Sequence, residues 1–220
     1  MKLSSYCLIL ILFLFSCVPS QSYFKTPNNV HNIKVVLHLL NKPDMAGIIT
    51  VPWENNFDKD QHYTDAVKFL PEGENVEVNL NIKDVLGYTL GKDYYALKKI
   101  DLFINDQYHL LFVKRLTSEN SRIQLYELYE TGLGNDMSEI RYSYFISLPK
   151  FGQFETLNTS SKRLIPDFDL KMSALVSDCP ALAEKIRNRE NGYFVPFASF
   201  KTFKHREVMT KIIGEYNNCQ

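Results

Sequence analysis

Short apolar segments recur about every ten residues between positions 33 and 148, and turn residues separate them. In one of them Val76, Val78, Leu80 and Ile82 alternate with polar residues, which predicts a strand with one buried face. No 12-residue helix lies between the segments, which disfavours a doubly wound α/β fold. The spacing is typical of strands in antiparallel order, in a β-barrel or a β-sandwich. The predicted strands cover residues 33–40, 47–53, 66–70, 76–82, 93–104, 108–115, 121–130 and 141–148.

After Pro166 the spacing of the apolar residues becomes helical. Ser177 and Asp178 are candidate N-caps for a helix, because short polar side chains accept hydrogen bonds from the first backbone N–H groups of a helix. We therefore predict an α+β, mainly β fold: a β-rich domain over residues 33–165, followed by a C-terminal helical segment over residues 166–220 that contains a helical hairpin. The expected helical elements are residues 170–176, a helix from Pro180 to a stop at Asn191 and Gly192, and a last helix over about 204–217.

Two cysteines bracket the predicted hairpin. Cys179 precedes its first helix, and Cys219 follows its second helix, 40 residues further along (219 − 179). The ends of an antiparallel hairpin lie close together, so we expect a disulfide between Cys179 and Cys219. Such a bond is typical of an oxidising compartment.

Residues 1–22 are expected to be a signal peptide. Lys2 precedes an apolar run over residues 8–15, which is too short to cross a membrane core and has the length of a secretory signal. Two kinds of processing fit the residues that follow. In the first, the run ends in a lipobox and Cys17 is lipidated; in the second, cleavage follows Ser22. The first predicts a chain anchored to a bacterial envelope membrane, with residues 23–32 as a tether, and the second predicts a soluble periplasmic or secreted protein.

The net charge of the chain without its signal peptide limits the classes of partner that we expect. Removing the signal peptide takes away Lys2 and no acid, which leaves 24 basic residues against 25 acidic ones. A neutral chain argues against nucleic acid, which requires clustered lysine and arginine, and against electrostatic docking to anionic lipid. The expected partners are a membrane, reached through the lipid anchor, and another envelope protein or a glycan.

The C-terminal segment resembles an uncharacterised family of exported proteins and lipoproteins of Bacteroidota, in which a DCP segment and a terminal YN-x-C follow a β-rich region. The resemblance implies an exported location and this architecture, and it adds no chemistry. A weaker likeness in the β-rich region lies at Leu125 and Tyr126. The residues that carry it in the C-terminal segment are Met172, Ser173, Val176, Asp178, Cys179, Pro180, Leu182, Ala183, Lys185, Ile186, Gly192, Tyr193, Glu215, Tyr216, Asn217 and Cys219.

The residues show no catalytic motif and no metal-binding motif. His38 and His109 lie in predicted strands and could meet across a sheet, but polar strand positions are the simpler interpretation. Gly87 and Gly91 are interpreted as turn glycines. The remaining histidines (His31, His62 and His205) are scattered, and the acids of the calcium-loop candidate (Asp58, Asp60 and Asp65) lack the glycine and the glutamate of an EF-hand.

Aromatic residues give the one indication of binding. They could line a carbohydrate or protein contact, although core packing is the simpler interpretation. The pair Asp101 and Glu127 illustrates how an acid pair for hydrolysis could arise by chance. The aromatic residues concerned are Trp53, Tyr88, Tyr94, Tyr95, Tyr126, Tyr129, Tyr142 and Tyr144.

The expected function is a non-catalytic, membrane-anchored envelope protein that binds another envelope component, without a cofactor. An exported hydrolase with dispersed active-site residues is the alternative, and a deep pocket with buried acids or an acid–histidine pair would favour it. A structural subunit of an outer-membrane assembly is a third hypothesis, which a large flat apolar face would indicate.

Overall fold

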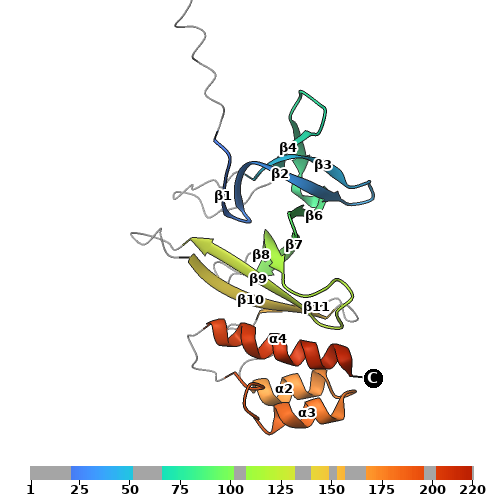
Figure 1. Ribbon diagram of the computed structural model, residues 1–220, viewed down its shortest axis with the longest axis vertical. Coiled ribbons are helices and arrows are strands. Elements are labelled where there is room, and N and C mark those ends of the chain that lie inside the picture. The colour runs from blue at the N-terminus through green and yellow to red at the C-terminus, as the bar shows by residue number, and fades with distance from the viewer. Residues whose placement is uncertain are drawn as a thin grey trace, which may run out of the picture.

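The computed structural model describes residues 21–51, 66–101, 108–131, 140–148, 153–156, 167–195 and 202–219. Over these residues the protein is mainly β, with three α-helices at the C-terminal end (Figure 1). Residues 1–20 lie outside this range, so the predicted lipidation site Cys17 does too, and so does the bond after Ser16 that a lipobox would cleave.

One antiparallel sheet contains every described strand. Ten strands follow the order β11-β10-β9-β8-β7-β6-β2-β3-β4-β5, and β1 pairs with β2 beside this path. The predicted antiparallel, β-rich fold is therefore confirmed. The strands are β1 (Tyr23–Thr26), β2 (Asn29–Leu39), β3 (Met45–Val51), β4 (Ala66–Pro71), β5 (Val78–Asn81), β6 (Val85–Leu90), β7 (Asp93–Asp101), β8 (Tyr108–Arg115), β9 (Gln124–Thr131), β10 (Ile140–Leu148) and β11 (Gln153–Thr156), with a 3₁₀ turn, η1 (Ile82–Asp84), between β5 and β6.

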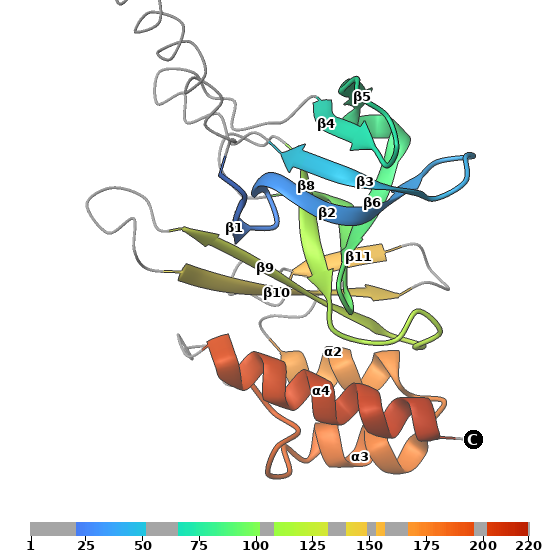
Figure 2. The same cartoon turned by 45° about the horizontal axis from the view of Figure 1, so that its top comes forward.

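The sheet is not closed into a barrel, so that alternative is wrong. Among the described residues, β5 and β11 each pair with one strand, and the ladder between them is continuous rather than split into two sheets. Strong twist brings distant parts of the sheet together. β2, β3 and β4 cross above β9, β10 and β11, and β6 and β8 run between the two levels (Figure 2). Phe24 of β1 reaches Tyr129 of β9, with ring centroids 6.4 Å apart, although no ladder joins these two strands in the described part of the chain.

Two large apolar clusters stabilise the two levels. The first lies within the curve of the sheet and includes the fully buried Tyr88, Phe69 and Phe112. The second joins one face of β9 and β10 to the helices, through Leu125, Ile146 and their neighbours. Each large apolar side chain buried in this way contributes about 1.5–3 kcal/mol to folding.

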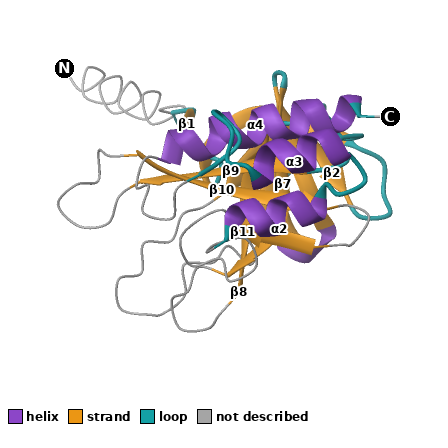
Figure 3. Cartoon of the chain, turned by 90° about the horizontal axis from the view of Figure 1, so that it is seen from below, coloured by secondary structure: helices purple, strands orange, loops and turns teal. Residues whose placement is uncertain are grey.

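Three helices cover the lower level of the sheet (Figure 3). They are α2 (Phe168–Leu175), α3 (Pro180–Arg187) and α4 (Thr202–Asn218), and α4 packs on β9 and β10. The predicted hairpin corresponds to α3 and α4, and α2 largely matches the predicted helical spacing of residues 170–176. None of the described helices is both long and apolar enough to cross a membrane.

The predicted N-cap and the predicted C-terminal stop of the middle helix are wrong, whereas its predicted start is confirmed. Cys179 occupies the N-cap position, and no side chain caps the helix there. Pro180 is the first helical residue, as predicted. The helix ends at Arg187 rather than at Asn191 and Gly192, because Arg189 already has a left-handed backbone (φ 54°).

The segment 23–32, predicted to be a tether, instead forms β1 and the start of β2. Hydrogen bonds join Pro27 and Asn28 of this segment to the sheet. The Asn28 amide donates to the carbonyl of Phe112 (3.0 Å) and accepts from the N–H of Phe112 (2.7 Å), and Tyr88 donates to the carbonyl of Pro27 (2.9 Å). A buried asparagine with both amide atoms satisfied can occupy a core position.

Two expectations about strands also fail. Val76, which precedes β5, is 70% exposed, and Val78 in β5 is 38% exposed, because β5 is a short strand at the end of the described strand order and pairs there only with β4. Gly87 lies inside β6 rather than in a turn. A Cβ there would lie 2.3 Å from the carbonyl of Tyr95, so the close approach of β7 requires glycine. Gly91, with φ of 60°, is the turn glycine that was predicted.

Candidate functional site

Arg122, in the loop between β8 and β9, connects the sheet to the helices. Its guanidinium donates to Asp178, to the hydroxyl of Tyr216 (2.9 Å) and to the backbone carbonyls of Tyr216 (3.2 Å) and Cys219 (3.4 Å). The backbone N–H of Arg122 donates to the side chain of Asn217 (3.0 Å). The planar donor fork of arginine suits such convergent acceptors, which a lysine could not engage together.

The ring of Tyr216 packs against this guanidinium. The Cζ atom of Arg122 lies 3.7 Å from the ring centroid, and the Tyr216 hydroxyl donates to Asp178 (2.8 Å). That hydrogen bond is the main reason why the pKa of Asp178 lies below its ordinary value, and the positive charge of Arg122 adds to the effect. Burial raises the pKa of Tyr216, and its bond to Asp178 raises it further. At neutral pH the network therefore consists of a cation, an anion and a neutral phenol.

The predicted disulfide is confirmed, and it joins the two chain segments that carry this network. Cys179 and Cys219 are joined, with their Cα atoms 6.0 Å apart, so the start of α3 is bonded to the residue after α4. Asp178 and Tyr216 come from these same two chain segments. The bond therefore holds both partners of Arg122 in place.

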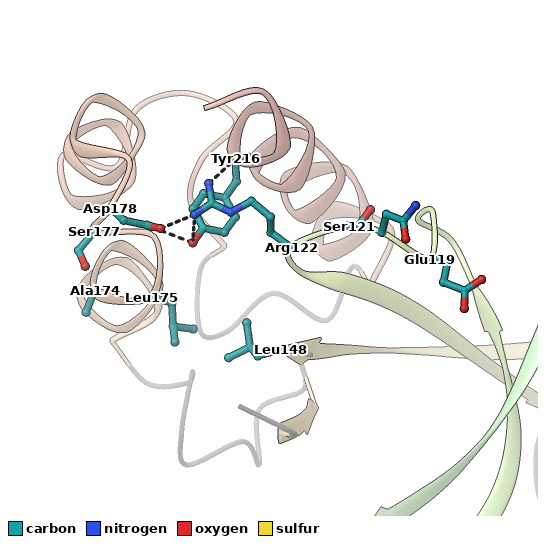
Figure 4. A pocket seen from close by; sticks show the side chains of 10 residues that line it. Glu119, Ser121, Arg122, Leu148, Ala174, Leu175, Ser177, Asp178 and Tyr216 are labelled. Carbon is teal, nitrogen blue, oxygen red and sulfur yellow. Dashed lines mark hydrogen bonds and ion pairs between the residues drawn. The ribbon is translucent and has the colours of Figure 1, made fainter. Parts of the chain in front are cut away.

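A cavity of about 580 Å³ opens beside the network (Figure 4). We call it the junction cavity, because it lies where the β8–β9 loop meets the helices. Leu148, Ala174 and Leu175 supply apolar surface, and the other side chains offer hydroxyl, amide and charged groups. The polar lining residues are Glu119, Asn120, Ser121, Arg122, Ser177, Asp178 and Tyr216.

A second group of polar side chains lies on the outer face of β2, β6 and β7. His38 Nδ1 lies 2.9 Å from a carboxylate oxygen of Asp44, and His38 Nε2 lies 2.8 Å from the hydroxyl of Thr89. Tyr94 packs edge-on against the imidazole, with ring centroids 5.3 Å apart, and Arg115 lies over the Tyr94 ring at 4.5 Å. This is an acid–histidine pair, which is one of the observations that would favour the hydrolase alternative, although Asp44 is 58% exposed and the pair lies at the surface.

The other histidines lie apart from His38 in the sequence, and the structure describes only some of them. β6 and β7 lie between the strands of His38 and His109, so these two residues are not cross-strand neighbours. His205 is buried in α4, and His31 lies in β2, whereas His62 is outside the described residues. Within the part of the chain that the structure describes, no three histidine, cysteine or acidic side chains gather as a metal site would require.

The aromatic residues proposed for binding mostly belong to the core. Tyr88, Tyr95, Tyr126 and Tyr144 are buried, which confirms core packing for them. Tyr94 and Tyr129 are half-buried, Tyr142 is exposed, and Trp53 lies outside the described residues.

The structure describes only some of the acidic side chains that the sequence offers as candidates. Glu127 is buried and faces Arg206 of α4 at 3.5 Å. The side chain of Asp101 lies outside the described part of the chain, as do Asp58, Asp60 and Asp65.

No protein-family model, curated protein or solved structure matches this chain.

Proposed function

We propose that the protein is an exported, lipid-anchored envelope protein that binds another envelope component through the junction cavity. Its described part contains a disulfide, which is consistent with export. The volume of the cavity falls within the range of ligand pockets, about 300–1,000 Å³. A cavity of that size suits a sugar unit or a protruding peptide segment better than a flat protein face.

One observation carries the proposal: the walls of the cavity are held together before any ligand arrives. Arg122, Asp178 and Tyr216 form a closed set of hydrogen bonds, and the Cys179–Cys219 bond fixes the two helical segments behind them. A preorganised site loses little conformational entropy on binding, so more of the contact energy appears as affinity.

The anchor would keep this site near a membrane. β1 begins at Tyr23, six residues after Cys17, and an extended chain of that length spans roughly 20 Å. β1 lies in the half of the molecule away from the helices (Figure 1), so the junction cavity would face away from the membrane.

The test is capture of envelope neighbours by the membrane-bound protein, with partners identified by mass spectrometry. Ala174→Trp places a large side chain at the exposed wall of the cavity and should reduce recovery of the specific partner at least tenfold. Ala181→Trp is the matched control, because Ala181 is an exposed alanine on α3 that does not line the cavity, and it should leave recovery unchanged. Equal recovery with both variants would contradict binding at this site.

The anchor has its own measurement. Cys17→Ala should move the protein from the membrane fraction to the soluble fraction. Retention of the variant in the membrane fraction would contradict lipidation at Cys17 as the anchor.

A further inference from the structure

We propose that Asp44, His38 and Thr89 form a hydrolytic relay, in which the Thr89 hydroxyl is a nucleophile toward carboxylic esters. This activity would be additional to binding at the junction cavity, which lies on other residues. The inference rests on the order and spacing of three side chains, from β2, from β6 and from the turn between β2 and β3.

The spacing matches that of an activated nucleophile. A nucleophilic hydroxyl needs a base within about 2.6–3.2 Å, and the base in turn needs a group that orients it. The separations of 2.8 Å and 2.9 Å on the two sides of His38 meet both requirements.

The chemistry of the carboxylate determines the direction of the relay. An ionised carboxylate can only accept, so Asp44 accepts a hydrogen bond from the Nδ1–H of His38. The neutral imidazole then presents the lone pair of Nε2 to Thr89, and the threonine hydroxyl donates to it. Asp44 acts as a positioning residue, while His38 and Thr89 would touch the reacting atoms.

The sheet fixes this arrangement. His38 is opposite Gly87 in the β2–β6 ladder, and Thr89 lies two residues beyond Gly87 on the same face of β6. Because position 87 has no side chain, the Tyr94 phenol can lie above it, where a Cβ would be 2.9 Å from the Tyr94 hydroxyl. Tyr94 thus forms a wall beside the imidazole.

The relay is also accessible to a substrate. The side chain of His38 is 22% exposed and that of Asp44 is 58% exposed. Val36, which is opposite Thr89 on β2, is 38% exposed and offers an apolar surface for an acyl group.

The reaction balances without a cofactor. The Thr89 oxygen bonds to the ester carbonyl carbon, and His38 Nε2 accepts the hydroxyl proton. The bond from that carbon to the alcohol oxygen breaks, and His38 gives the proton to the leaving alcohol. Water then bonds to the acyl carbon while His38 Nε2 accepts its proton. The bond from that carbon to the Thr89 oxygen breaks, and His38 returns the proton to Thr89 as the carboxylic acid leaves.

To test the proposal, the purified full-length protein is incubated with p-nitrophenyl acetate. Release of p-nitrophenol is followed, and the acetylated residue is located by peptide mass spectrometry. Acetyl on Thr89 is expected. Thr89→Val and His38→Gln should each slow release by roughly 10²–10⁴-fold, the usual contribution of general base catalysis, whereas Thr89→Ser should retain the adduct.

Two further variants distinguish catalysis by the relay from a loss of rate that is caused by disturbed packing. His31→Gln changes another histidine of β2 and should leave the rate unchanged. Asp44→Asn should lower the rate and alter the pH–rate profile, which loss of local packing alone would not do. Wild-type protein without acetyl at Thr89, or variants Thr89→Val and His38→Gln with wild-type rates, would overturn the proposal. Circular dichroism of each variant verifies that the fold is intact.

Discussion

Arg122 combines several roles in one side chain, because its acceptors come from α4, from the residue after it and from the turn before α3. Arg122→Lys keeps the charge but replaces a planar fork by a single ammonium group. We expect the variant to lose unfolding free energy, because an ammonium group can engage only some of the acceptors that the planar fork holds together. Urea unfolding measures this loss. Arg187→Lys, at an exposed position of α3, is the control, and an equal loss in both variants would contradict the role of the fork.

His205 should make stability depend on pH. It is buried, and burial lowers the pKa of its imidazole below the ordinary value of 6.5. The unfolded chain therefore binds the proton more readily than the folded one, so stability is complete above pH 6.5 and falls as the pH drops below that value. His205→Gln should lessen the fall between pH 6.5 and the range where carboxylates titrate. Thermal unfolding across this range tests it, and an unchanged slope in the variant would contradict the assignment.

The residues around the junction cavity could be predicted from the sequence only in part. Cys179 and Cys219 were recognisable because a cysteine pair bracketing two helices has few other uses in an exported chain. Asp178 was interpreted as an N-cap, since a short acid before Pro180 fits that role locally. Its actual partners, Arg122 and Tyr216, are 56 and 38 residues away along the chain, and no local pattern indicates such a pairing.

At the scale of secondary structure, β6 shows how a glycine can serve opposite purposes. Gly87 and Gly91 looked alike in the sequence, and Gly91 does form a turn. Gly87 is in a strand because Tyr94 and Tyr95 of the next strand approach its backbone. β6 was therefore not predicted, although it joins β2 to β7 and so connects the two levels of the sheet.

A pair of glycine substitutions tests this explanation. Gly87→Ala should lower the unfolding free energy by about 1–3 kcal/mol, because the added methyl group would overlap the Tyr95 carbonyl. Gly214→Ala is the matched control: no atom lies within 4 Å of the added carbon, and in the helix α4 the change should stabilise by up to about 1 kcal/mol. Chemical unfolding of both variants gives the comparison. A neutral or stabilising Gly87→Ala would contradict the close approach of β7.

Other elements followed from the sequence more directly. Seven of the predicted strands coincide with β2, β3, β4, β7, β8, β9 and β10 to within a few residues, because their apolar runs are long and turn residues bound them. The burial predicted for β5 is wrong. Alternating apolar and polar residues indicate a buried face only where a neighbouring element covers that face. β1 was missed because the polar segment after it is held in place from a distance. The amide of Asn28 forms its hydrogen bonds with the backbone of Phe112, 84 residues away along the chain.

At the scale of the whole molecule, the disulfide should contribute more than any single contact. The chain-entropy relation gives about 4 kcal/mol for a loop of 40 residues. Replacing both cysteines by alanine should lower the unfolding free energy by up to this amount. Comparing the urea midpoints of the oxidised protein and the double variant measures it. A difference below about 1 kcal/mol would mean that Arg122 and the helix contacts suffice without the bond.

The same bond changes what proteolysis can do to the molecule. Every peptide bond between Cys179 and Cys219 lies inside a covalent ring that also contains α3 and α4. A protease that cuts once within this ring would produce a nicked protein and release no fragment. α4 would stay attached and could remain packed on β9 and β10, so the protein would keep its helical layer after damage that would remove it from an unbridged chain.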